Sequence, residues 1–127
     1  MVRDLGRPPD KSWLDRIDRI DGKINSEAVE TLRRTTVLLR SKSIALRAVF
    51  PAVAKSFWKV NGDVASGVAE QLGSLSANTP DGSIYEDDLF FDTYYHLNEQ
   101  GREIRARELA AILDRVFETE SLTIRSR

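Results

Sequence analysis

Hydrophobic side chains recur every three or four positions in the first part of the chain. In residues 12–24 they alternate with charged residues, a pattern that predicts an amphipathic helix with Ser12 as its N-cap. We expect this helix to pack on the rest of the domain, although its apolar stripe also suits a partner or dimer helix. A second helix is expected to begin at Asn25 or Ser26, just ahead of acidic residues that favour a helix N-terminus.

A different pattern follows in residues 43–50, SIALRAVF, which carry apolar side chains at both odd and even positions and stop at Pro51. That pattern predicts a strand buried on both faces of a parallel sheet, entered directly from the preceding helix. Residues 83–85 are expected to form a second short strand. Helices and strands in alternation indicate an α/β fold that is rich in helix and has few parallel strands.

The stretch between these two strands is expected to be largely helical. Residues 52–61 suit a short helix or a loop, Gly62 is expected to end that piece, and Asp63 to cap a helix that runs to Leu75. The acidic run 86–88 is expected to be a solvated loop, because it lacks the spaced oxygen donors of a calcium loop.

The C-terminal part holds the last predicted helix. Asn98 is expected to cap it, Gly101 to weaken its first turn, and residues 119–127 to form a polar tail. Six apolar side chains of this helix are expected to face the core: Ala106, Leu109, Ile112, Leu113, Val116 and Phe117. Three basic side chains are expected to face solvent: Arg102, Arg105 and Arg107.

The composition limits the classes of function. The chain has 127 residues, 41% hydrophobic and 31% charged, which suits one domain with a packed core. Its 19 Lys and Arg against 20 Asp and Glu argue against nucleic acid as a partner. No apolar run is long enough to span a bilayer, and residues 1–11 lack the centre of a signal peptide. Cysteine is absent and histidine occurs once, so thiolate chemistry and multi-histidine zinc sites are excluded, no cofactor or metal is expected, and the compartment is left open.

The candidate chemistry lies in the turn before the last predicted helix. Asp92 precedes His96, the sole histidine, by four positions. A carboxylate bound to one ring nitrogen fixes the tautomer of a histidine and stabilises the imidazolium that forms when the other nitrogen takes a proton. We therefore take Asp92 and His96 as candidate catalytic residues, beside the plainer interpretation that a lone histidine near an acid is structural.

The surrounding string, FDTYYHLNEQGREIRARELAAIL, resembles the C-terminal block of the SGNH (GDSL-like) hydrolases. In that family an Asp and a His just before the last helix complete a Ser–His–Asp triad. The positions that carry the likeness are Asp92, Tyr95, His96, Leu97, Asn98, Gly101 and Arg102. Three residues separate the Asp from the His here, whereas the most familiar family pattern has two. The likeness spans about residues 26–117 and implies a partial three-layer, flavodoxin-like fold.

For function, the resemblance implies an esterase or acyltransferase acting on ester or acetyl groups, such as those of a carbohydrate or cell-envelope polymer. The family's nucleophile motif, a Gly-Asp-Ser after the first strand, has no counterpart in this sequence, nor do the Gly and Asn blocks of its oxyanion hole. Residues 25–118 would then be the C-terminal half of the fold, inactive alone.

A half fold implies a partner. A sheet of two parallel strands exposes unpaired edges, so we expect it to be covered by residues 1–24, by a second copy of the chain, or by a separate N-terminal half that supplies the serine. Two other interpretations remain open. One is a non-catalytic interaction or remnant domain, and the other is a small helical regulator whose likeness to the hydrolases is accidental.

Overall fold

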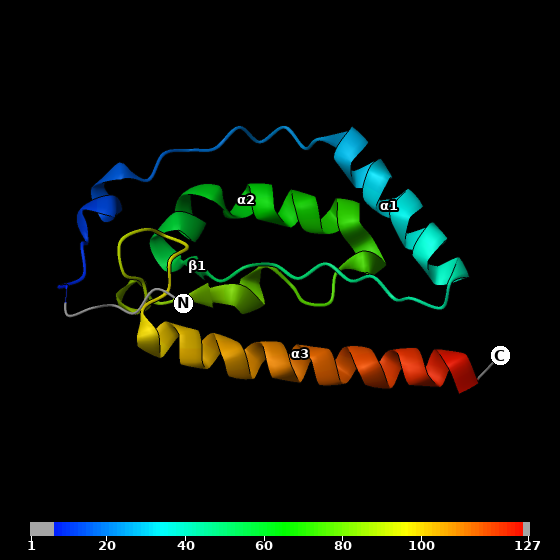
Figure 1. The fold of residues 1–127 in the computed structure, drawn as a ribbon. Helices are drawn as coiled ribbons and strands as arrows, with labels where there is room; N and C mark the ends of the chain where they lie inside the picture. Colours follow the sequence, from blue (N-terminus) through cyan, green and yellow to red (C-terminus); the bar gives the residue numbers. More distant parts are fainter. Residues whose placement is uncertain (1–6, 126–127) are drawn as a thin grey trace.

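The computed structural model describes residues 7–125, which form a helix-rich α/β arrangement (Figure 1). Its main elements are helices α1 (Ser26–Ser41), α2 (Lys55–Leu72) and α3 (Glu99–Arg125) and strands β1 (Val53–Ala54) and β2 (Ile84–Tyr85). The two strands form a parallel pair, with Val53 opposite Ile84. They lie between α2 and α3 in Figure 1. The predicted class, helix-rich α/β with few parallel strands, is confirmed.

A small apolar core lies where the sheet meets the N-terminal segment. Its buried members are Trp13, Ala52, Ala54, Tyr85 and Phe90. The rings of Trp13 and Phe90 meet edge to face, with their centroids 6.2 Å apart, a geometry that aromatic pairs favour. The expectation that the N-terminal segment packs on the domain is confirmed through Trp13.

The helix predicted over residues 12–24 is wrong beyond its first turn. Only Ser12–Arg16 is helical, as a 3₁₀ turn without a side-chain N-cap bond. Residues 17–25, which we call the strap, are irregular and connect this turn to α1. Helix α2 bonds to two of the backbone polar groups of this strap. Asn61, itself buried, accepts a hydrogen bond from the Ile20 amide at 2.9 Å and donates one to the Asp18 carbonyl at 3.1 Å. These tertiary bonds replace the intrahelical ladder.

An ion pair also fixes the strap. Both carboxylate oxygens of Asp63 accept hydrogen bonds from the Arg19 guanidinium. These bonds lower the pKa of Asp63 below its usual value. Asp63 is thus a partner of the strap and not, as predicted, the cap of a new helix.

The strand predicted over residues 43–50 is also wrong. This segment is extended, but it makes only one isolated parallel bridge, between Ala48 and Ser76. At its end, the amide of Phe50 donates to the side-chain oxygen of Asn78 at 2.7 Å instead of to a neighbouring strand. The regular strand begins after Pro51, at Val53, whereas the second strand appears at Ile84–Tyr85, as predicted.

Helix α2 continues through Gly62, where a break was predicted. The indole of Trp58, one turn earlier, packs directly against Gly62. A Cβ at this position would lie 2.7 Å from Cε2 of Trp58. Gly62 therefore leaves room for an aromatic ring on the surface of the helix, a use of glycine that the sequence pattern does not distinguish from a break.

Helix α3 is longer than predicted, since residues 119–125 continue it where a polar tail was expected. Of the six side chains expected to face the core, only Ile112 is buried and Val116 is half-buried. Leu113 and Phe117 are 54% and 68% exposed. Arg102 and Arg105, expected in solvent, are half-buried. Residues 7–125 therefore cover only a narrow side of α3.

The predicted caps of α1 and α3 are confirmed. The side-chain oxygen of Asn25 accepts from the Ala28 amide at 3.0 Å, and that of Asn98 accepts from the Gly101 amide at 2.9 Å. Both bonds satisfy amides that the first helical turn leaves without an intrahelical partner. Within residues 7–125, none of the helices has the length and apolar character needed to cross a membrane.

Candidate functional site

The loop before α3 is closed into a hairpin-like turn by main-chain bonds. Phe90 and Leu97 form an antiparallel bridge, in which the Phe91 amide donates to the His96 carbonyl at 2.8 Å. The buried ring of Phe90 anchors the base of the turn in the core. At its tip, the Tyr94 carbonyl accepts from the amide of Ala54, the last residue of β1, at 3.0 Å. The turn is therefore tied both to the sheet and to the start of α3.

Gly101 allows the close approach between this turn and α3. A Cβ on Gly101 would lie 2.6 Å from the Leu89 carbonyl oxygen and 2.9 Å from Cδ2 of Leu97. The first turn of the helix thus sits against the base of the loop, where the Asn98 amide donates to the same Leu89 carbonyl at 2.9 Å. The glycine expected to weaken the helix is required by this packing.

Asp92 and His96 lie side by side on this turn. The distance from Oδ1 of Asp92 to Nδ1 of His96 is 2.6 Å, and the two side chains are 41% and 40% exposed. The Thr93 hydroxyl accepts from the His96 amide at 3.1 Å, and the Phe91 ring packs edge-on against the imidazole at 5.8 Å. The predicted juxtaposition of the two residues is therefore present in the structure. Their exposure leaves them accessible to solutes.

This geometry defines what the pair can do. In the neutral imidazole, a proton on Nδ1 donates to Asp92 and leaves Nε2 as the acceptor. Among residues 7–125, no hydroxyl group is hydrogen-bonded to Nε2 of His96. Ser56 is instead bonded to Asp87, and Ser83 to Asn78 and Phe50. The described part of the chain thus presents an imidazole bonded to a carboxylate, without a hydroxyl group in contact with Nε2.

The acidic run after β2 has a structural role that the sequence did not reveal. The carboxylate of Asp87 accepts from the amide of Ser56 at 2.9 Å and from its hydroxyl. Ser56 lies in the first turn of α2, so Asp87 supplies from a distant loop the negative charge that a helix N-terminus favours. Glu86 pairs with Lys55 in the same place, at 2.9 Å. Lys55 and Glu86 are 31 positions apart, so no local sequence pattern could predict their contact.

A second network, also missed, joins α3 to the sheet. The Tyr85 hydroxyl donates to Glu108 at 2.5 Å, and Arg105 donates to Glu108 at 2.8 Å and to the Phe50 carbonyl at 2.5 Å. Burial and, after it, the bond to Glu108 raise the pKa of Tyr85 to about 12. An arginine predicted to face solvent thus satisfies a backbone carbonyl beside the sheet.

Across the described residues, no three His, Asp or Glu side chains gather in the way that metal ligands do. A cavity of about 330 Å³ lies between α3 and residues 77–82, and neither Asp92 nor His96 lines it.

The fold and site together define a small helix-rich α/β protein with an exposed Asp–His pair at the carboxyl side of a parallel strand pair. Comparison with protein-family models, curated proteins and solved structures found no match for the chain.

Proposed function

We propose that this chain is the C-terminal part of an SGNH-like (GDSL-like) esterase or acyltransferase and supplies the Asp–His pair of a Ser–His–Asp triad. The observation that carries the proposal is the 2.6 Å contact between Asp92 and His96 on an exposed turn directly ahead of α3. The sequence around the pair resembles the C-terminal block of that family. A parallel strand pair between helices is in keeping with a partial three-layer, flavodoxin-like fold.

In the proposed reaction, Nε2 of His96 takes the proton of a serine hydroxyl supplied by another polypeptide segment. The serine oxygen attacks the ester carbonyl, and the resulting imidazolium then gives its proton to the departing alkoxide. Water or an acceptor alcohol reverses these steps to release the acyl group. Asp92 orients the ring through Nδ1 and stabilises the imidazolium throughout.

The chain alone is expected to lack this activity, because the nucleophile and the oxyanion donors act as a unit with the base. The purified chain should hydrolyse p-nitrophenyl acetate no faster than its His96→Ala variant. Clear His96-dependent turnover would show that the chain contains its own nucleophile, contrary to the proposal.

The decisive experiment adds the missing half. The chain is co-expressed with the product of neighbouring coding sequence that carries a Gly-Asp-Ser-like block, and ester hydrolysis is measured for the complex. We expect His96→Ala to lower kcat by at least about a thousandfold and Asp92→Asn to have a comparable effect. Asp88→Asn, which changes an exposed acid near the turn, is the matched control and should leave kcat unchanged.

A second candidate function is a non-catalytic interaction domain. The observation that favours it is the exposed apolar surface of two helices: Val37 and Leu38 on α1 are 72% and 58% exposed, and Leu113 and Phe117 on α3 are 54% and 68% exposed. Such patches commonly mark interfaces. If a purified complex shows no loss of activity on His96→Ala but dissociates on Phe117→Ser, the interaction domain is the better description.

A further inference from the structure

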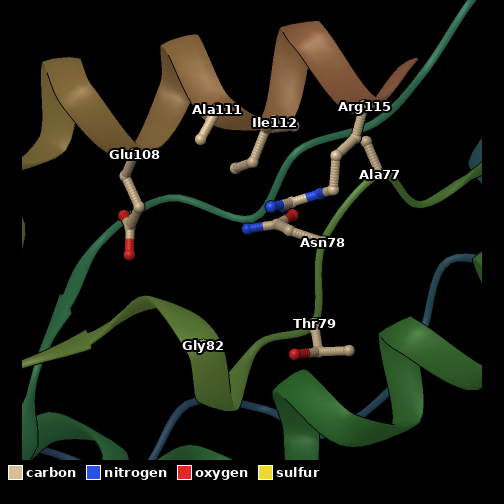
Figure 2. A pocket seen from close by; sticks show the side chains of 8 residues that line it. All are labelled: Ala77, Asn78, Thr79, Gly82, Glu108, Ala111, Ile112 and Arg115. Carbon is tan, nitrogen blue, oxygen red and sulfur yellow. The ribbon is translucent and has the colours of Figure 1, made fainter. Parts of the chain in front are cut away.

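A cavity separate from the Asp–His turn lies along the middle of α3. It has a volume of about 330 Å³ and is bounded by α3 on one side and by residues 77–82 on the other (Figure 2). The α3 residues that line it, Glu108 to Arg115, begin nine positions after the helix starts at Glu99, about 14 Å along the axis. Its volume lies in the range of small-molecule sites.

Two charged side chains reach this cavity from the same face of α3. Figure 2 shows Arg115 extended from the helix toward residues 77–82. Across the described chain, no acceptor is bonded to the Arg115 side chain. Glu108, two turns earlier, faces the same cavity. The two residues are seven positions apart, so they lie on one helix face about 10 Å apart along the axis.

Glu108 and Asn78 are held in place by the network behind them. One carboxylate oxygen of Glu108, Oε2, accepts from Tyr85 at 2.5 Å and from Arg105 at 2.8 Å. In residues 7–125, no protein donor is bonded to the other oxygen, Oε1. The Asn78 side chain is fixed by bonds to Phe50 and Ser83. Glu108 and Asn78 are therefore preorganised, which lowers the entropic cost of binding at these two side chains.

The remaining lining defines the rest of the ligand. Ala77, Ala111 and Ile112 contribute apolar surface, and Thr79 places a hydroxyl at the far side (Figure 2). The charge of Glu108 is balanced by its ion pair with Arg105. Among the described residues that line the cavity, Arg115 is the charged one with no bonded partner, and its guanidinium suits one carboxylate, to which arginine can bind through two parallel hydrogen bonds.

From these contacts we propose that the cavity binds a small organic carboxylate that carries a hydroxyl or amino group at its other end. The carboxylate pairs with Arg115, a short apolar segment lies against Ala111 and Ile112, and the donor group bonds to Oε1 of Glu108. This site is independent of the proposed hydrolase chemistry.

The proposal is tested with three matched probes and the full chain. 4-Hydroxybutyrate has the charge and the donor, butyrate lacks the donor, and 4-hydroxybutyramide lacks the charge. Amide chemical shifts are followed by ¹H–¹⁵N NMR during each titration. We expect saturable shifts in residues 77–82 and 108–115, with 4-hydroxybutyrate binding several-fold more tightly than butyrate and about tenfold more tightly than the amide.

Variants separate this site from surface association. Arg115→Gln is expected to weaken 4-hydroxybutyrate binding about tenfold, whereas Arg107→Gln, an exposed arginine elsewhere on α3, should not. Ala111→Leu is expected to fill the cavity and abolish binding. Ala110→Leu, at the neighbouring exposed position, is the control. It should retain binding and so show that a longer side chain on this helix is tolerated.

Several results would overturn the proposal. They are the absence of saturable shifts for every probe at tens of millimolar, equal affinity for the amide and the acid, and unchanged binding by Arg115→Gln or Ala111→Leu. His96→Ala should retain full binding. Because His96 does not line the cavity, the binding test and the test of ester hydrolysis can fail independently of each other.

Discussion

At the scale of single residues, the best-defined chemistry is the contact between Asp92 and His96. Four positions apart, they are brought together by a turn that also bonds the His96 amide to Thr93. The contact was predictable because it is local. The bond between Tyr85 and Glu108 was not, since it spans 23 positions and depends on how α3 lies against the sheet.

The protonation site of His96 can be tested directly. Because Oδ1 of Asp92 lies 2.6 Å from Nδ1, the neutral ring is expected to carry its proton on Nδ1. In Asp92→Asn the amide can offer a donor instead, which favours the proton on Nε2. Long-range ¹H–¹⁵N NMR of the imidazole distinguishes the two tautomers. An Nε2-protonated ring in the unmodified chain would contradict a general-base role at Nε2.

The raised pKa of Tyr85 predicts that the folded chain loses stability at alkaline pH. This pKa is about 12 in the folded chain and about 10 when unfolded. The folded state therefore retains the proton more tightly, and this stabilisation is complete below pH 10 and lost as the pH rises toward 12. The loss should be of the order of 2–3 kcal/mol. The free energy of unfolding, measured with urea across the same pH range, should not show this loss in Tyr85→Phe. The same dependence on pH in both proteins would refute the prediction.

At the scale of elements, two glycines in helices act through packing. Gly101 admits the Leu89 carbonyl against α3, and Gly62 admits the ring of Trp58 on α2. From sequence, a glycine inside a helical pattern predicts weakness or a break. The reason for keeping it is visible only when the neighbour that occupies the space of the missing Cβ is known.

Gly101→Ala is expected to destabilise the chain by about 1–3 kcal/mol, because its Cβ would overlap a backbone oxygen that cannot move alone. The altered loop should also change the imidazole resonances of His96. Gln100→Ala, an exposed position in the same turn, is the control. Thermal unfolding and the His96 NMR signals provide the readout, and an increase in stability would rule out the close packing.

Gly62→Ala offers a comparison within one helix. Alanine normally stabilises a helix interior by about 1 kcal/mol relative to glycine. At Gly62 the Cβ would meet the Trp58 ring at 2.7 Å, whereas at Gly67 it would meet only the flexible tip of Ile24 at 3.3 Å. We expect Gly67→Ala to be neutral or stabilising and Gly62→Ala to be destabilising in urea unfolding. Equal gains in both variants would show that Trp58 yields without cost.

At the scale of the whole molecule, the N-terminal strap and the small core depend on each other. Trp13 is 5% exposed and packs on the residues around the sheet, and the strap beyond it is bonded to Asn61 and Asp63 of α2. Because few of the described side chains are buried, one tryptophan contributes a large share of the burial. The strap is therefore an integral part of the fold.

Trp13→Ala is expected to lower the free energy of unfolding by about 3–5 kcal/mol. Leu14→Ala, which removes a neighbouring side chain that is 37% exposed, should cost much less. Urea unfolding followed by circular dichroism measures both. Similar losses for the two variants would mean that Trp13 contributes no specific packing.

The sequence by itself determined what depends on neighbours along the chain. Asn25 and the acidic residues after it located the start of α1, and Asn98 marked the start of α3. The interval between Asp92 and His96 was short enough for one turn to close. Each of these features is set by backbone geometry and side chains within a few residues. The alternation of helix and strand also sufficed for the α/β class.

Only the tertiary structure decided which of several compatible local patterns was used. Residues 43–50 have a strand pattern, but they form only one isolated bridge to another segment. Residues 17–24 have a helix pattern, but Asp18 and Ile20 form backbone hydrogen bonds with Asn61 of α2 instead of within a helix. Arg105 and Glu108 form their network, and Arg115 borders the cavity, because α3 rests on the sheet in one orientation. Free energy from such distant contacts outweighs local propensities that differ by less than about 1 kcal/mol per residue.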